Sequence, residues 1–195
     1  ERRAAQSAIY SVARCLATLF APILSFTADE VWELLPATPE PSVHLALFDG
    51  LEEVPARPEE DRRWSRLLAL REVVNGQLER LRRGGDVGKS LEAQVHLDGD
   101  LASVRDDLTA CGADLAELLI VSRVGWEERS EGAEGCSAYP GLVVGSSPYD
   151  APTCARCWRR MDAAVQDPEL PDLCQRCHVV VRLLLEEGRV QLDRD

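Results

Sequence analysis

The sequence predicts a mainly helical protein with a small α+β unit in its middle and a zinc ribbon at its C-terminal end. Three observations support this fold class. Apolar residues recur every three or four positions over two long stretches, which is typical of helices with one buried face. Apolar and polar residues then alternate strictly over residues 91–98, and two C-x-x-C pairs follow near the C-terminus. We therefore expect three parts, residues 1–88, 89–150 and 151–195.

The first part begins with a helix over residues 5–23, where Pro22 should end or bend it. Thr27 and Glu30 have the spacing of a capping box, in which the hydroxyl and the carboxylate each accept a hydrogen bond from a backbone N–H group. They predict the start of a second, short helix that Pro36 stops.

Five prolines between residues 36 and 58 predict an extended connection, with a short strand near residues 43–47. A long helix over residues 59–83 should follow, and Gly84-Gly85 would end it. Between Arg57 and Arg83 there are eight Arg and five Asp or Glu, so this helix is also a candidate track for phosphate groups.

The middle part should hold a half-buried strand over residues 91–98, closed by Asp98-Gly99. Further elements are expected after it: a helix near residues 101–111, an apolar run at 118–124, an acidic loop at 127–137 and a strand near 142–144.

Composition limits the compartment and the partners. The hydrophobic fraction of 45% and the charged fraction of 29% are those of a globular protein, and no apolar run approaches the roughly 20 residues of a membrane span. The net charge of −12 weakens a nucleic-acid function without excluding it. Seven cysteines, an odd number, in a helix-rich chain without a signal peptide indicate a reducing compartment, and we expect the cytoplasm. Because the chain starts without Met and enters a helical pattern at once, we expect it to be a piece of a longer protein.

The cysteine module carries the strongest chemical signal in the sequence. Cys154 and Cys157 form one C-x-x-C turn, and Cys174 and Cys177 form a second. Sixteen residues separate Cys157 from Cys174. Two such turns supply the four thiolates of a tetrahedral zinc shell. The site would be structural, because four thiolates leave no open position for water. Iron in a rubredoxin-like site uses the same ligands, so the sequence leaves iron open.

Basic and aromatic residues surround these ligands. Trp158 and the guanidinium groups of Arg156, Arg159 and Arg176 form a set that can stack on a base and hold phosphates. Alternatively, Trp158 covers the metal site while the arginines are solvated. The spacing alone does not separate the two interpretations.

Three segments in this order resemble the C-terminal part of bacterial isoleucyl-tRNA synthetases. Residues 19–32 read LFAPILSFTADEVW, which is similar to a signature of the anticodon-binding helical domain in the class I synthetases for branched aliphatic amino acids. The helix with Trp64, Leu68 and Arg71, followed by GKSLEA at residues 88–93, resembles a second stretch of that family. The cysteine module, CARCW followed by LCQRC, resembles its C-terminal zinc finger.

The resemblance implies a helical bundle of the anticodon-binding type and one structural zinc ion. It implies a tRNA-binding part of an isoleucine–tRNA ligase that recognises the anticodon stem and loop, with Arg156 and Trp158 at the positions expected to meet tRNA. ATP would act only in a catalytic domain outside this chain, since the chain has no HIGH or KMSKS motif. We expect a monomer whose partners are isoleucine tRNA and the other domains of the same enzyme. The alternatives are the finger of a formamidopyrimidine-type DNA glycosylase, which the cysteine module also resembles, and a structural zinc-ribbon adaptor.

Overall fold

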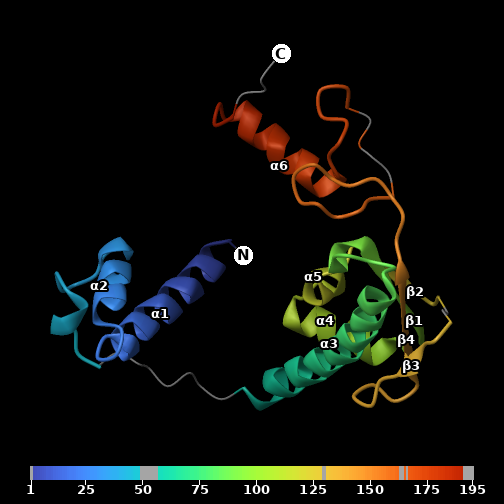
Figure 1. The fold of residues 1–195 in the computed structure, drawn as a ribbon, viewed down its shortest axis with the longest axis horizontal. Coiled ribbons are helices and arrows are strands. Elements are labelled where there is room, and N and C mark those ends of the chain that lie inside the picture. Colours follow the sequence, from blue (N-terminus) through green and yellow to red (C-terminus); the bar gives the residue numbers. More distant parts are fainter. Residues whose placement is uncertain (1, 49–56, 129–130, 163–164, 166, 191–195) are drawn as a thin grey trace. The chain divides into compact units, whose positions relative to one another are not determined.

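The structure is a computed structural model that describes residues 2–48, 57–128, 131–162, 165 and 167–190. The chain divides into two compact units, Glu1–Ala56 and Arg57–Asp195, which are described separately here (Figure 1). Helices predominate, and a small four-stranded sheet and a cluster of four cysteines accompany them, so the expected fold class is confirmed. None of the described helices is long and apolar enough to cross a membrane.

The first unit is built around one buried tryptophan. Trp32 is 1% exposed and donates its indole N–H to the carbonyl oxygen of Glu40, at 2.9 Å. The Asp29 carboxylate accepts hydrogen bonds from the Ser42 hydroxyl at 2.7 Å and the Val43 N–H at 3.0 Å. These bonds hold the segment after the helices against them. The elements of this unit are α1 (Arg2–Phe20), α2 (Ser25–Leu34) and the 3-10 helix η1 (Val43–Leu45).

Two local predictions for this unit are wrong. The strand expected at residues 43–47 is the 3-10 turn η1, because Asp29 and Ser42 satisfy the backbone N–H groups there and curl the chain. The capping box of Thr27 and Glu30 does not form either. Helix α2 already begins at Ser25, so both residues lie inside it, and no side chain caps its N-terminus.

Helices α1 and α2 leave an apolar face open within this unit. A groove of about 270 Å³ is lined by residues that include Leu16, Phe20, Leu24 and Val31. Phe26 beside it is 93% exposed. Contiguous apolar surface of this kind is characteristic of a face that another element covers.

The second unit is a mixed sheet in the order β2-β1-β4-β3, with helices on one of its faces (Figure 1). Strand β1 runs parallel to β2 and antiparallel to β4, and the crossover from β1 to β2 passes through two short helices. The elements of this unit are α3 (Pro58–Gly84), the 3-10 helix η2 (Ser90–Glu92), β1 (Ala93–Gly99), α4 (Ala102–Cys111), α5 (Leu115–Leu119), β2 (Arg123–Trp126), β3 (Glu134–Gly135), β4 (Leu142–Pro148) and α6 (Gln175–Glu186).

Alternation in β1 sets which face of the sheet is buried. Ala93, Val95 and Leu97 are fully buried and pack in one core with Leu67 and Val74 of α3. Burying a valine or leucine side chain contributes roughly 1.5–3 kcal/mol, so this shared core accounts for much of the stability of the unit. The predicted alternation is confirmed, although the strand begins two residues later than the pattern does.

The long helix α3 matches its predicted bounds within one residue and ends at Gly85, whose φ of 80° favours glycine. It lies in the second compact unit, where it contacts α4, α5 and β4. The division into parts at residues 88 and 150 stays a prediction. The acidic segment expected to be a loop contains the short strand β3, paired with β4, while residues 129–130 lie outside the described residues.

A buried carboxylate joins three segments of the second unit. Asp107 of α4 is 0% exposed. It accepts hydrogen bonds from a guanidinium nitrogen of Arg66 at 2.5 Å and from the Tyr139 hydroxyl at 2.8 Å. Arg63 lies 3.6 Å away, and Arg66 also sits over the Tyr139 ring, 5.6 Å from its centroid. Because burial and this bond to Asp107 stabilise the neutral phenol, the pKa of Tyr139 is raised well above its ordinary value.

We expect Asp107→Asn to destabilise the second unit by about 2 kcal/mol, because Arg66 and Tyr139 lose their charged acceptor. Asp106→Asn is the matched control, since Asp106 is the exposed neighbour in the same helix. Urea unfolding followed by tryptophan fluorescence measures the difference. Equal midpoints for the two variants would contradict this role.

Candidate metal centre and nucleic-acid interface

Two turns of different kinds position the four cysteines. Cys154 and Cys157 lie in a loop closed by an isolated antiparallel bridge between Thr153 and Arg160. Cys174 is the N-cap residue of α6, and Cys177 lies in its first turn. The ligand set therefore joins a loop to the start of a helix, and a metal bound there would fix where α6 begins.

The four sulfurs are close enough to share one ion. All four Sγ atoms lie within 4.8 Å of one another, and those of Cys157 and Cys174 are 3.8 Å apart. A tetrahedral ion with metal–sulfur bonds of about 2.3 Å places its sulfurs about 3.8 Å apart. Cys154 and Cys177 are 0% exposed. The predicted residues thus converge with the donor chemistry and spacing that suit a metal ion.

Backbone N–H groups favour the thiolate form of Cys154. Burial raises the pKa of Cys154, but the N–H groups of Cys174, Cys157 and Arg156 outweigh it and bring that pKa to about 6. The Cys174 N–H lies 3.3 Å from the Cys154 sulfur. Burial raises the pKa of the Cys174 thiol to about 12. A metal ion must therefore displace a tightly held proton from this cluster when it binds.

The residues around the cluster form only a small apolar core. The apolar side chains buried with it are Met161, Leu170 and Leu173. A core of this size supplies little folding free energy, so metal binding would supply much of it.

His178 directly follows a ligand but does not join the sulfurs. Its Nε2 atom lies 2.7 Å from a carboxylate oxygen of Asp167, which also accepts hydrogen bonds from Arg182. The hydrogen bonds from His178 and Arg182 lower the pKa of Asp167 to about 2. The histidine thus joins α6 to the loop before it, which agrees with a supporting position outside the ligand set.

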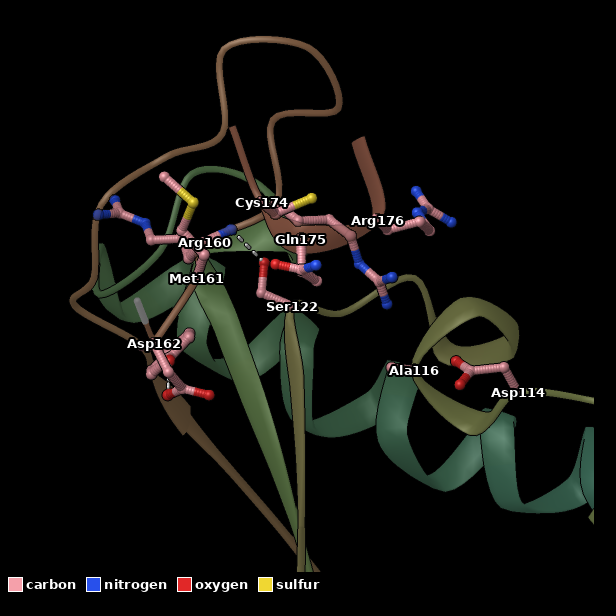
Figure 2. Close-up of a pocket in the computed structure, with 11 residues that line it drawn as sticks. Asp114, Ala116, Ser122, Arg160, Met161, Asp162, Cys174, Gln175 and Arg176 are labelled. Atoms are coloured by element: carbon pink, nitrogen blue, oxygen red, sulfur yellow. Dashed lines mark hydrogen bonds between the residues drawn. The ribbon is translucent and has the colours of Figure 1, made fainter. Parts of the chain in front are cut away.

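The cysteine module is attached to the turn between α5 and β2. The Arg160 N–H donates to the Ser122 hydroxyl oxygen at 2.7 Å (Figure 2). That hydroxyl donates to the carbonyl oxygen of Leu91 at 2.6 Å. A guanidinium nitrogen of Arg159 donates to the Val121 carbonyl oxygen at 3.2 Å. Since Leu91 lies in the 3-10 turn η2 that leads into β1, these bonds fix the module against the edge of the sheet.

Two hollows border this attachment. The larger, of about 410 Å³, has Ser122 and Arg160 at one side and Arg176 at the other, as Figure 2 shows. The smaller, of about 210 Å³, is lined by Leu91, Ala116, Glu117, Ile120, Cys157, Arg159 and Arg176. Arg159 and Arg176 line both hollows, so each hollow presents guanidinium groups to a ligand.

The three arginines proposed for tRNA have partners within the protein. Arg156 directs a guanidinium nitrogen toward the Cys177 sulfur, at 3.6 Å. Arg176 forms an ion pair with Glu117, and Arg159 lies 4.0 Å from the same carboxylate. One carboxylate thus faces two guanidinium groups, which leaves the site with an excess of positive charge. Arg156 offsets thiolate charge on the cluster.

Trp158 does not lie folded over the cysteines. Its side chain is 67% exposed, and its φ of 61° places it in the left-handed region, where its N–H donates to the Cys154 carbonyl oxygen at 2.9 Å. The Lys89 ammonium lies over the indole, 5.7 Å from the ring centroid. The exposure favours an indole available to a ligand over one that covers the metal site.

The residues that sequence reasoning missed are Lys89, Glu117 and Ser122. Their contacts to the module span 38 to 69 residues in sequence, and no local pattern signals them. The sequence does contain one signal for Lys89, which is the single lysine of the chain.

The arginine-rich face of α3 is largely occupied by ion pairs. Arg57, Arg62 and Arg82 pair with glutamates three residues away, and Arg80 pairs with Glu134 of β3. Arg63 and Arg66 face Asp107. These pairs reduce the positive charge that α3 offers to phosphates, so the module is the stronger candidate interface.

The chain is similar to known tRNA ligases over nearly its whole length. Residues 1–97 match the anticodon-binding domain of tRNA ligases. Over 194 residues, 97% of the chain, it is 38% identical to an isoleucine–tRNA ligase of Coxiella burnetii, of which it covers 20%. It is 40% identical to the Geobacter sulfurreducens isoleucine–tRNA ligase over 188 residues, and 37% identical to that of Moorella thermoacetica over 193 residues. These matches cover 93% and 96% of the chain but only 20% and 21% of the relatives, so the chain spans about a fifth of their length.

We expect Cys177→Ser to lower the affinity for added Zn²⁺ by more than the 10- to 100-fold that loss of an outer partner costs, because it removes a direct ligand. Cys15→Ser, which changes a half-buried cysteine of α1, is the control and should bind metal as the unsubstituted chain does. Competition with a chromogenic chelator measures both. Equal affinity in the two variants would mean that the sulfurs do not form a metal shell.

Metal affinity should also fall as the pH is lowered from 8 to 6. The thiol of Cys174, with its raised pKa, must lose its proton to bind, so binding releases protons and acid opposes it. The same chelator competition at a series of pH values measures this trend. An affinity independent of pH would indicate that protons are not displaced from these thiols.

Proposed function

We propose that this chain binds the anticodon stem and loop of isoleucine tRNA. It belongs to the isoleucine–tRNA ligase family, and its residues 1–97 match the anticodon-binding domain of tRNA ligases. The chain is homologous to the C-terminal part of these enzymes. In the longer enzyme, this binding would serve the ATP-dependent joining of isoleucine to its tRNA. ATP and isoleucine would bind in other domains, which are then its partners within one monomeric polypeptide.

The metal in this proposal is one structural zinc ion held by Cys154, Cys157, Cys174 and Cys177. A full shell of four thiolates suits zinc and leaves no position for a reacting water. When bound, the ion supplies folding free energy and a fixed geometry, and the chemistry of the enzyme lies elsewhere. Elemental analysis of reduced protein tests its identity, and iron in its place would refute zinc. We propose the cytoplasm as the compartment, because zinc binding needs these cysteines reduced.

The observation that carries the proposal is the exposed indole of Trp158 between cationic groups. An exposed tryptophan offers a face on which a base of a single-stranded loop can stack, and such stacking is sequence-tolerant. Arg159 and Arg176 share the carboxylate of Glu117, so a phosphate can recruit one guanidinium without leaving the carboxylate unpaired. Arg156 is proposed to contribute mainly by holding the cluster, through its contact with Cys177.

We expect Trp158→Ala to weaken binding of isoleucine tRNA by about 5- to 150-fold, since stacking on one base is worth about 1–3 kcal/mol. Trp158→Phe should keep most of the affinity because it keeps an aromatic face. Leu183→Ala, which removes another large exposed apolar side chain of the same module, is the control. Filter binding to the tRNA transcript measures all three.

Two results would refute the contact. Affinity unchanged in Trp158→Ala would remove the stacking surface from the proposal. Equal losses in Trp158→Ala and Leu183→Ala would indicate a general effect on the module. Stronger binding to duplex DNA than to tRNA would instead favour a glycosylase-like finger.

A further inference from the structure

We propose that Lys89 belongs to the RNA-binding surface and forms with Trp158 a two-residue platform, the Lys89–Trp158 platform. One base of a single-stranded RNA loop stacks on the open face of the indole, and the Lys89 ammonium binds the phosphate beside that base. This inference rests on the proposed function and adds a cation from a different part of the fold. Lys89 lies in the loop that leads into β1, whereas Trp158 lies in the cysteine module.

The contact between the two side chains defines the platform. The Lys89 Nζ atom lies 5.7 Å from the centroid of the Trp158 ring, within the distance at which a cation is attracted to an aromatic face. Both side chains are exposed, and Trp158 is 67% exposed despite this contact. The ammonium occupies one face of the indole, so the platform has room for one base on the other face.

The backbone at both ends of the platform is held in place before any ligand binds. The Glu92 carboxylate accepts hydrogen bonds from the Gly88 N–H at 2.7 Å and the Lys89 N–H at 3.1 Å, which fixes the turn that carries the lysine. These two bonds lower the pKa of Glu92, so the carboxylate stays ionised as an acceptor. On the other side, the left-handed conformation of Trp158 is fixed by its bond to Cys154. Binding then orders little beyond the lysine side chain itself.

The lysine has charge available for a phosphate. Within the part of the chain that the structure describes, Lys89 forms no ion pair with a carboxylate, whereas Arg159 and Arg176 face Glu117. No carboxylate therefore contacts its ammonium directly there, although the charge of Lys89 also acts at longer range on Glu92. An ammonium on a flexible stem suits a phosphate whose position varies, because it acts as a point charge without a fixed hydrogen-bonding plane.

The surroundings of the platform extend the same surface. The smaller hollow is lined by Leu91, two residues after the lysine, and by Cys157, directly before the tryptophan. Arg159 and Arg176 line its other side. A strand that stacks on Trp158 and touches Lys89 thus has two further cations next to it for its following phosphates.

The experiment measures the affinity of the zinc-loaded 195-residue chain for an RNA hairpin that carries the isoleucine anticodon loop, at several salt concentrations. We expect Lys89→Met to weaken binding about 3- to 10-fold at low salt. It should also reduce the slope of log affinity against log salt by about 0.7, the change for one phosphate contact on a single strand. Lys89→Arg should keep the slope, because it keeps the charge.

Arg62→Met is the matched control. It removes the same charge from the second unit, but Arg62 pairs with Glu59 in the first turn of α3. At 1.5 Å per residue, it lies about 33 Å along that helix from Gly84, near which the lysine loop begins. Arg62→Met should leave the slope unchanged. A loss of slope that is equal in Lys89→Met and Arg62→Met would show a general charge effect and overturn the platform.

The remaining outcomes separate this inference from the proposed function. If Trp158→Ala weakens binding while Lys89→Met matches the unsubstituted chain, the platform is refuted and the proposed function stands. If Lys89→Met weakens binding but Lys89→Arg is equally weak and the slope does not change, the lysine acts only in shaping the loop, which also refutes the phosphate contact. If the unsubstituted chain does not bind the hairpin at any salt concentration, both proposals fail.

Discussion

The convergence of four sulfur atoms within 4.8 Å constrains most of what surrounds it. It ties the loop of Cys154 and Cys157 to the start of α6, and it forces a tight turn directly after the second ligand. That turn places Trp158 in a left-handed conformation with its side chain in solvent. Four thiolates around a divalent ion carry excess negative charge, which explains why the Arg156 guanidinium lies beside the cluster. The cysteine cluster and the proposed RNA contacts thus depend on the same turn.

Hydrogen bonds between this module and the sheet fix the position of the turn. Ser122 accepts the Arg160 N–H and donates to Leu91, so a single hydroxyl joins the module, β2 and the turn into β1. The sheet is itself held by α3 through a continuous apolar core and by the buried carboxylate of Asp107. A change far from the cysteines can therefore reach the surface around Trp158 through this short chain of contacts.

The features that the sequence predicted are those set by local spacing. Alternation over residues 91–98 predicted the buried face of β1, because a strand has a period of two whatever it pairs with. The C-x-x-C spacing predicted the convergence of the sulfurs, because each C-x-x-C pair forms a tight turn that points two sulfurs at one spot. The strand expected at residues 43–47 failed because Asp29, on another element, competes for its N–H groups. The pairings of Lys89 and Glu117 were not predictable, since they depend on where the module packs.

The uneven distribution of charge has a consequence for how a polyanion meets this protein. The net charge of −12 makes the chain as a whole repel a polyanion, whereas Lys89 lies over the Trp158 indole and Arg159 and Arg176 line the hollow beside Cys157. Encounters in other orientations are disfavoured before contact, and screening limits this selection to about 8 Å at physiological salt. For the proposed RNA contact, the acidic charge elsewhere in the chain would disfavour indiscriminate adhesion to nucleic acids and favour approach to this cationic surface.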